Sequence, residues 1–178
     1  METQDLTTTT WQLDLAHSSV EFQVKHLMIS KVKGQFKSFD IKIDGDDFTK
    51  SKITATIDTT SISTGDAGRD QHLMGNDFFA SHDYPTILFE SKSVAGDGEQ
   101  FILVGDMTIK GQTHQVILEM EYHGTMTDPW GAKKAGFSVT GIIHRDQFGL
   151  TWNAALEAGG VLVSDEVRIS CDIQMVQN

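Results

Sequence analysis

Hydrophobic and polar residues alternate along most of this chain. Val20, Phe22 and Val24 are apolar, and the polar residues Glu21 and Gln23 lie between them. Strict alternation buries one face of an extended segment and exposes the other, as in a strand of an antiparallel sheet. The pattern predicts strands at 11–16, 19–27, 32–44, 52–60, 86–94, 100–109, 113–123, 136–145 and 166–176, of which the first two can form one bent strand.

Turn signals and two irregular segments separate the predicted strands. Asp44-Gly45 ends one strand, and hairpin turns are expected at 95–99 and 110–112. Residues 65–81 are predicted to form a short helix followed by a turn. Residues 147–160 are predicted to hold a second short helix, which ends at the two glycines 159–160.

The number and length of the strands indicate an all-β fold. Their dry faces can be hidden between two packed sheets or inside a closed barrel, which leaves no edge strand. Long strands with few helices favour an extended barrel of eight antiparallel strands, with one or two short helices near its mouth. The 178 residues fit one domain, which we predict over 11–176, after a flexible N-terminal segment at 1–10.

The dry face of such a barrel would line its interior. By parity the candidates are Val20, Phe22, Val24, Phe36, Phe39, Ile41, Ile57, Phe89, Met107, Ile109, Leu118, Met120, Phe137, Val139, Ile143, Ile169 and Ile173. The helical segment adds Leu73, Met74, Phe78 and Phe79, which could plug one mouth. Phenylalanine and methionine make adaptable walls for a flexible aliphatic guest. Alternation alone leaves open whether the interior is hollow or filled by its own side chains.

Charge and composition narrow the classes of partner and compartment. The formal net charge of −11 argues against a nucleic acid and against electrostatic docking on anionic lipid. Apolar runs are shorter than the roughly 18 residues of a transmembrane helix, and the polar N-terminus does not resemble a signal peptide. We therefore expect a cytoplasmic protein, not an integral membrane protein, or a periplasmic or secreted one if a leader has been removed.

Several polar residues are candidates for a headgroup or mouth site, namely His26, Arg69, Asp70, His72 and Arg145. At (i, i+3) spacing Arg69 and His72 share one face of the predicted helix and could clasp a ligand headgroup. Alternatively, an ion pair such as Asp70–Arg145 pins the helix across the opening. By parity Arg145 points inward, so it needs a partner, either a group of the protein or a phosphate or carbonyl of a ligand.

Signals for catalysis and metal binding are weak. The chain has no GxSxG elbow and no glycine-rich phosphate loop after a strand. The single cysteine, Cys171, lies on the apolar side of a predicted strand and has no partner for an intrachain disulfide. The seven histidines form no HExxH motif. We therefore expect neither a metal, nor a resident cofactor, nor an enzyme.

A series of short motifs follows in a characteristic order from Trp11 to Met175. They are Trp11-Gln-Leu-Asp, His17-Ser-Ser-Val-Glu-Phe, Val24-Lys-His-Leu, Gly34-Gln-Phe-Lys-Ser-Phe, Ser61-Ile-Ser-Thr, Arg69-Asp-Gln-His-Leu, Asp77-Phe-Phe, Tyr84-Pro-Thr-Ile-Leu-Phe-Glu-Ser, Gly105-Asp-Met-Thr-Ile-Lys-Gly and Arg145-Asp-Gln-Phe-Gly. Together they resemble the YceI-like family of bacterial lipid-binding, or polyisoprenoid-binding, proteins. The resemblance implies a lipocalin-like barrel, a tunnel that holds a long fatty chain, and a homodimer.

The residues and the resemblance together predict a carrier of an apolar small molecule. A polyprenyl chain, an isoprenoid quinone or a fatty-acid derivative would lie inside the barrel for storage, transport or sequestration. Two alternatives remain open. One is a stress-related interaction module with a filled barrel, and the other is an accessory protein in redox or heme metabolism.

Overall fold

The computed structural model describes residues 10–154, 156 and 162–177. Its strands are β1 (Trp11–Leu13), β2 (Ser19–His26), β3 (Ser30–Phe36), β4 (Phe39–Asp44), β5 (Lys52–Asp58), β6 (Ile62–Ser63), β7 (Thr86–Asp97), β8 (Gln100–Ile109), β9 (Gln112–Thr127), β10 (Lys133–His144) and β11 (Val163–Gln177). The helix α1 spans Ala67–Met74, and the 3-10 helices are η1 (Leu15–His17), η2 (Thr59–Ser61) and η3 (Arg145–Phe148).

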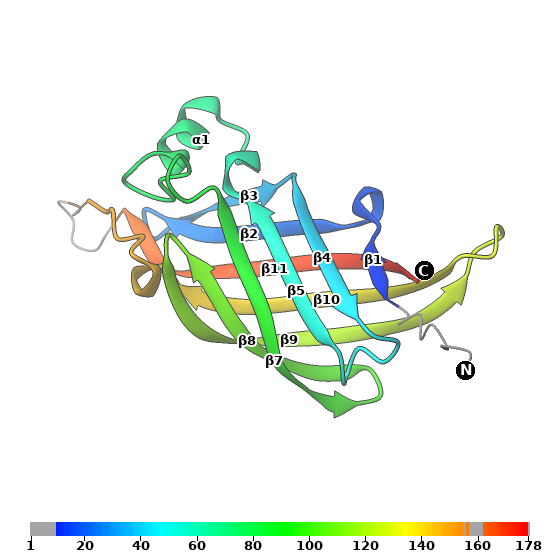
Figure 1. Ribbon diagram of the computed structural model, residues 1–178. Helices are drawn as coiled ribbons and strands as arrows, with labels where there is room; N and C mark the ends of the chain where they lie inside the picture. Colours follow the sequence, from blue (N-terminus) through cyan, green and yellow to red (C-terminus); the bar gives the residue numbers. More distant parts are fainter. Residues whose placement is uncertain (1–9, 155, 157–161, 178) are drawn as a thin grey trace.

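The sheet closes into an antiparallel barrel because the short strand β1 pairs with both β4 and β11. The ring runs through β1, β4, β5, β7, β8, β9, β10 and β11, so it has the predicted eight strands (Figure 1). β2 continues the path of β1 after η1 and pairs with the other half of β11, then with β3. The first two predicted strands are therefore two separate strands, β1 and β2, with η1 between them, and not one bent strand.

Two predicted elements are wrong in detail. The strand expected over 32–44 is broken at Lys37 and Ser38, because β3 pairs with β2 whereas β4 pairs with β1 and β5. The helix expected over 147–160 is not formed in its described part. The helical turn is instead η3, and it ends where Gly149 adopts a φ of 74°. Residues 155 and 157–161, with the two glycines, lie outside the described residues, as does most of the predicted flexible segment at 1–10.

The barrel interior is also the hydrophobic core. Along β8 the buried residues Phe101, Leu103, Met107 and Ile109 alternate with more exposed ones, as the polar–apolar pattern predicts. Gly105 completes the buried side of β8. A Cβ there would lie 2.5 Å from the Glu90 carbonyl oxygen and 2.5 Å from the Phe89 ring, so the ring occupies the space that a side chain would need.

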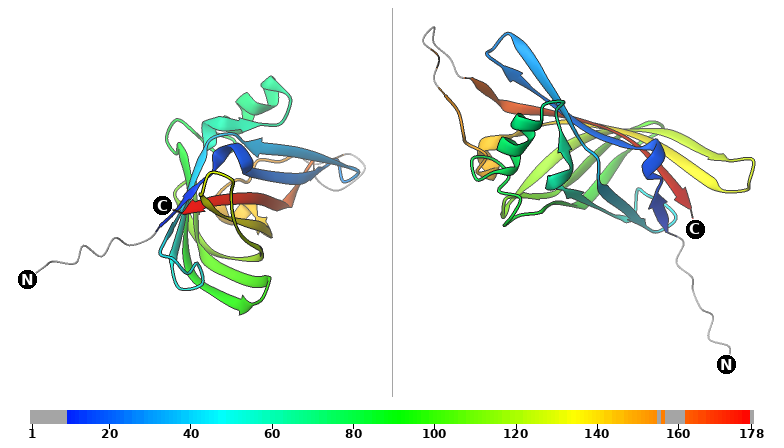
Figure 2. Two further views of the ribbon diagram at one scale, coloured as in Figure 1. Left: turned by 90° about the vertical axis from the view of Figure 1, so that its right-hand side faces the viewer. Right: turned by 90° about the horizontal axis from the view of Figure 1, so that it is seen from above.

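The two ends of the barrel differ. Figures 1 and 2 show the β2–β3 turn and the segment after β10 at one end, and the long β9–β10 hairpin at the other. We name the first the Arg145 end, after the residue that begins η3. We name the second the Phe48 end, where Phe48 from the β4–β5 turn packs against Phe101, Tyr122 and Phe137 at centroid distances of 4.8–5.2 Å.

The predicted helix in 65–81 is confirmed as α1, which lies outside the barrel wall (Figure 1). Its N-cap is Asp66, whose carboxylate accepts a hydrogen bond from the Arg69 N–H at 2.9 Å, as capping residues do at an open helix end. No helix among the described residues is long and apolar enough to cross a membrane.

Candidate functional site

An apolar cavity of about 180 Å³ lies inside the barrel. Its lining residues come mostly from the strands, with Phe79, Arg145 and Leu150 from other segments, and they are apolar except for Glu21 and Arg145: Val20, Glu21, Phe22, Phe36, Ile41, Ile43, Ile53, Ala55, Ile57, Phe79, Ile87, Phe89, Leu103, Met107, Ile109, Leu118, Met120, Phe137, Val139, Ile143, Arg145, Leu150, Val167, Ile169, Cys171, Ile173 and Met175. A cavity walled in this way offers a guest dispersion contacts but hardly any hydrogen bonds.

Most of the residues proposed to line the interior, from parity or from the helical segment, border this cavity. The exceptions are Val24, Phe39, Leu73 and Phe78. Phe39 is buried elsewhere in the core, and Val24 and Leu73 are half-buried. Phe78 is buried beside Trp152, at 5.5 Å between ring centroids. Met74, named with the helical segment, also packs on the core without reaching the cavity. The ligand-binding role of all these residues stays a prediction.

The structure adds lining residues that the parity argument did not name. Most of them, such as Ile43, Ile53 and Leu103, lie at alternate positions of strands that were predicted. The alternation could therefore have identified them as lining residues. Leu150 is different, because it lies in the irregular segment after η3, where no periodicity indicates which side chain turns inward.

The residues that line the cavity are spread along much of the barrel. On β11 they extend from Val167 to Met175, a strand length of about 27 Å at roughly 3.4 Å per residue. Ligand pockets commonly measure about 300–1,000 Å³, so a long guest would have to displace side chains of the wall. Met107 and Met120 suit such adjustment, because an unbranched thioether side chain has several rotamers of similar energy.

Arg145 is buried, with 6% of its surface exposed, and reaches the cavity as its parity predicted. Its guanidinium donates to four backbone carbonyls: Nε to Ser164 at 2.8 Å, Nη1 to Leu150 at 2.6 Å and to Trp152 at 2.9 Å, and Nη2 to Val163 at 3.2 Å. Burial lowers the pKa of Arg145, and the carboxylates of Asp165 and Asp146 oppose that shift. Arg145 thus ties the irregular segment after η3 to the start of β11.

The predicted Asp70–Arg145 ion pair is wrong. Asp70 instead accepts hydrogen bonds from the Thr64 N–H at 2.9 Å and the Thr64 hydroxyl at 2.6 Å. Arg69 donates to the same residue, from Nε to the Thr64 hydroxyl at 2.7 Å and from Nη2 to the Thr64 carbonyl at 2.8 Å. Both side chains therefore hold α1 to the loop before it.

The other proposed mouth residues do not converge on the cavity. His72 hydrogen-bonds Asp77 at 2.9 Å and lies edge-on to Trp152 at 4.9 Å between ring centroids. His26 ends β2 and pairs with Ser30. Of the five proposed mouth residues, Arg145 alone borders the cavity.

Cys171 borders the cavity as a neutral thiol. Burial raises its pKa to about 12, and the nearby carboxylates of Asp172 and Glu21 act in the same direction. A thiol with such a pKa is almost entirely protonated at neutral pH and is a poor nucleophile. Within the described residues no three His, Cys, Asp or Glu side chains are grouped to hold a metal ion.

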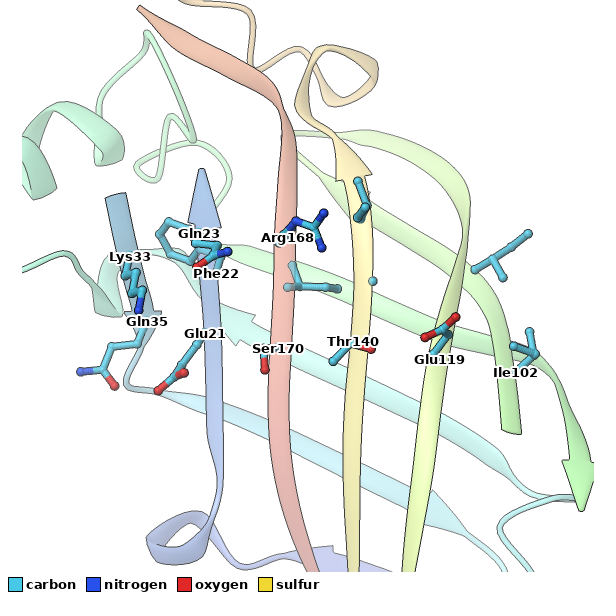
Figure 3. Close-up of a pocket in the computed structure, with 15 residues that line it drawn as sticks. Glu21, Phe22, Gln23, Lys33, Gln35, Ile102, Glu119, Thr140, Arg168 and Ser170 are labelled. Carbon is cyan, nitrogen blue, oxygen red and sulfur yellow. The ribbon is translucent and has the colours of Figure 1, made fainter. Parts of the chain in front are cut away.

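A second, larger hollow lies on the outer face of the sheet. It measures about 920 Å³ and is lined by outward-facing side chains of β2, β3, β8, β9, β10 and β11 (Figure 3). Its lining mixes charges of both signs, such as Glu21, Glu119, Lys33 and Arg168, with the exposed Ile117. It is thus an open surface of mixed polarity, unlike the interior cavity.

A closed antiparallel barrel with one helix outside its wall and an apolar interior belongs to the lipocalin-like class. The family model for the YceI-like domain matches residues 11–175, so the chain belongs to the YceI family. A UPF0312 protein of Staphylococcus aureus is 43% identical over 169 residues, which cover 93% of this chain and 96% of the relative. A UPF0312 protein of Staphylococcus epidermidis is 41% identical with the same coverage.

Solved structures show the same fold. BcnA of Burkholderia cenocepacia superposes with a TM-score of 0.78 at 25% identity, over 91% of this chain and 98% of BcnA. The YceI protein of Campylobacter jejuni gives 0.75 at 33% identity, over 93% and 96% of the two chains. A polyisoprenoid binding domain from Saccharophagus degradans gives 0.69 at 13% identity, over 94% and 98%.

Proposed function

We propose that the barrel binds one slender apolar molecule, such as an isoprenoid or fatty chain, inside its interior cavity. The observation that carries the proposal is the wall itself, which is apolar along the length of the barrel and contains almost no hydrogen-bonding group. A polar ligand would lose its hydrogen bonds to water there, whereas a hydrocarbon loses none. The fold of this family also occurs in a domain described as polyisoprenoid-binding.

The energetics favour a chain over a compact molecule. Each buried CH₂ contributes about 0.8 kcal/mol, so a five-carbon unit contributes about 4 kcal/mol before ordering costs. The present volume of about 180 Å³ leaves room for only part of a long chain. Binding must therefore include side-chain rearrangement along the wall, whose cost lowers the net affinity.

We extend the proposal to a binding role in storage or transport. Among the described residues that line the cavity, the ionisable side chains are Glu21, the carbonyl-bound Arg145 and the neutral thiol of Cys171. A second copy of the chain as a partner stays a prediction.

The proposal is tested by native mass spectrometry of protein purified from cells and of protein mixed with a prenyl alcohol or a fatty acid. Ala55→Phe places a ring in the cavity, whereas Thr56→Phe places the same ring on the exposed face of the same strand. We expect the wild type and Thr56→Phe to take up a chain and Ala55→Phe to take up none.

The smallness of the cavity favours one rival, an interaction module with a filled barrel. That rival predicts that purified wild-type protein is free of lipid and takes up neither probe. Equal uptake by Ala55→Phe and Thr56→Phe would also overturn the proposal, because the ligand would then lie outside the barrel.

A further inference from the structure

The turn between β2 and β3 exposes three consecutive apolar side chains. Ile29 is 87% exposed, Met28 56% and Leu27 39%. The turn projects at the Arg145 end of the barrel (Figure 2, right). Single exposed apolar residues are common on protein surfaces, but three in a row at a projecting tip form a patch that folding does not require.

The backbone of this turn is strained. Leu27 and Met28 have φ values of 54° and 63°, and the Ile29 N–H donates to the His26 carbonyl at 3.3 Å. Positive φ at both central residues is the pattern of a type I′ turn, which favours Asn-Gly. Large apolar residues occupy these positions although they fit the backbone poorly, and such strain often accompanies function.

The strands that carry the turn are basic, although the whole chain is acidic. Lys25 lies directly opposite Lys31, a like-charge pair that disfavours pairing of the strands. Lys33 lies one pair further along the outer face, and Arg168 of β11 is aligned with Gln23 beside it (Figure 3). None of these four cations has an ion-pair partner within 4.0 Å among the residues that the structure describes.

The turn is connected to the end of the cavity. The Leu27 N–H donates to the Leu162 carbonyl at 2.9 Å, and His26 is paired with Val163. The Val163 carbonyl in turn accepts from Arg145, which borders the cavity. Whatever the turn contacts therefore lies close to the Arg145 end of the interior.

We propose that the β2–β3 turn docks on the surface of an anionic lipid bilayer. Leu27, Met28 and Ile29 enter the interfacial layer, while Lys25 and Lys31 contact the anionic headgroups. Screening limits the reach of each charge to about 8–10 Å, so the charges near the turn decide docking rather than the net charge of the whole chain. Asp165 and Glu166 lie in the irregular part of β11 opposite Lys25 and oppose this attraction, although Asp165 is paired with His144 at 2.9 Å. A projecting tip suits a fluid interface, because a protein partner would need a matching pocket. This goes beyond the proposed cavity ligand and does not depend on it.

The experiment is co-sedimentation of the full chain with phosphatidylcholine vesicles, with and without anionic phosphatidylglycerol. We expect binding to the anionic vesicles only, weaker at high salt. Lys31→Glu should weaken it by at least about fivefold, since each lysine near an anionic surface contributes about 1 kcal/mol. Ile29→Ser should weaken it by about tenfold through loss of the inserted side chain.

Two exposed residues in other turns serve as matched controls, one for the apolar variant and one for the charge variant. Trp130 in the β9–β10 turn is 88% exposed, as much as Ile29, so Trp130→Ser should leave binding unchanged, and so should Lys50→Glu. A double variant, Leu27→Asn with Met28→Gly, relaxes the turn and should keep the fold while losing binding. Absence of wild-type binding to anionic vesicles, or equal loss in the Trp130→Ser control, would overturn the proposal.

Discussion

At the scale of single residues, Arg145 shows how one buried charge can organise an irregular segment. The segment after η3 has few strand partners, so several of its carbonyls need donors from side chains. The guanidinium supplies donors in a planar fork, and lysine has no equivalent geometry. Arg145 therefore holds the segment after η3 to the start of β11 by hydrogen bonds to carbonyls, and does not form an ion pair with α1.

Replacing this residue should destabilise the fold strongly. We expect Arg145→Met to lower the free energy of unfolding by about 3–5 kcal/mol, because it leaves several buried carbonyls without donors. Arg145→Lys should recover only part of that loss. Urea unfolding followed by circular dichroism measures both. As a control, Lys92→Met removes an exposed ion pair with Asp106 and should cost at most about 1 kcal/mol. An equally small effect at Arg145 would contradict this account.

At the scale of elements, barrel closure depends on β1, which has only three residues. Asp14 follows it and strengthens the junction. Its carboxylate accepts hydrogen bonds from His17 at 3.0 Å and Gln174 at 2.9 Å, and it lies 3.5 Å from the Lys134 ammonium. These contacts hold the bend between β1 and β2 against β10 and β11. Strand β1 forms few backbone hydrogen bonds because it is short, and the side-chain contacts of Asp14 add to the stability of its pairing.

This junction should make stability sensitive to acid. Burial raises the pKa of Asp14, but hydrogen bonds and charge from His17 and Lys134 outweigh burial, so its pKa lies below 3.8 in the folded protein. A lowered folded pKa contributes stability that is complete above the unfolded value and is lost as the pH falls through the folded one. We expect Asp14→Asn to cost about 1–2 kcal/mol at pH 7, with a smaller difference from wild type near pH 3 by urea unfolding. A cost that does not change with pH would contradict this origin.

At the scale of the whole molecule, the core and the proposed binding site occupy the same space. The strands that bury their apolar faces to fold also form the wall that a ligand would touch. Tighter packing of the core therefore leaves less volume for a ligand, and the small cavity reflects a core that is packed almost completely. A bound chain would replace the missing wall contacts and act as part of the core.

Binding should therefore stabilise the protein by mass action. A ligand at a hundred times its Kd adds about 2.7 kcal/mol to the free energy of unfolding if it binds only the folded state. We expect the thermal midpoint, measured by scanning fluorimetry, to rise with a long prenyl alcohol and less with a short one. The Ala55→Phe variant should show no rise. Equal shifts with long and short alcohols would argue against a tunnel.

Much of the fold was predictable from the sequence because alternation is a local property. Alternate side chains of one strand, as in Phe101 to Ile109 or Ile169 to Met175, face the same side of the sheet because the strand is pleated. This holds whichever neighbouring strand is the pairing partner. The end of a strand is less predictable. The break at Lys37 and Ser38 depends on a change of partner, which the alternation on either side does not reveal.

By itself, the sequence determined most of the strands and the side chains on their inward faces, and it favoured an antiparallel barrel over two packed sheets, because these follow from local periodicity and the need to bury apolar area. Only the tertiary structure decided how β1 closes the ring, that Arg145 binds carbonyls instead of Asp70, how little space the interior leaves, and that the β2–β3 turn lies beside the Arg145 end. Each of these depends on contacts between residues far apart in the chain, and no local pattern encodes which distant partners meet.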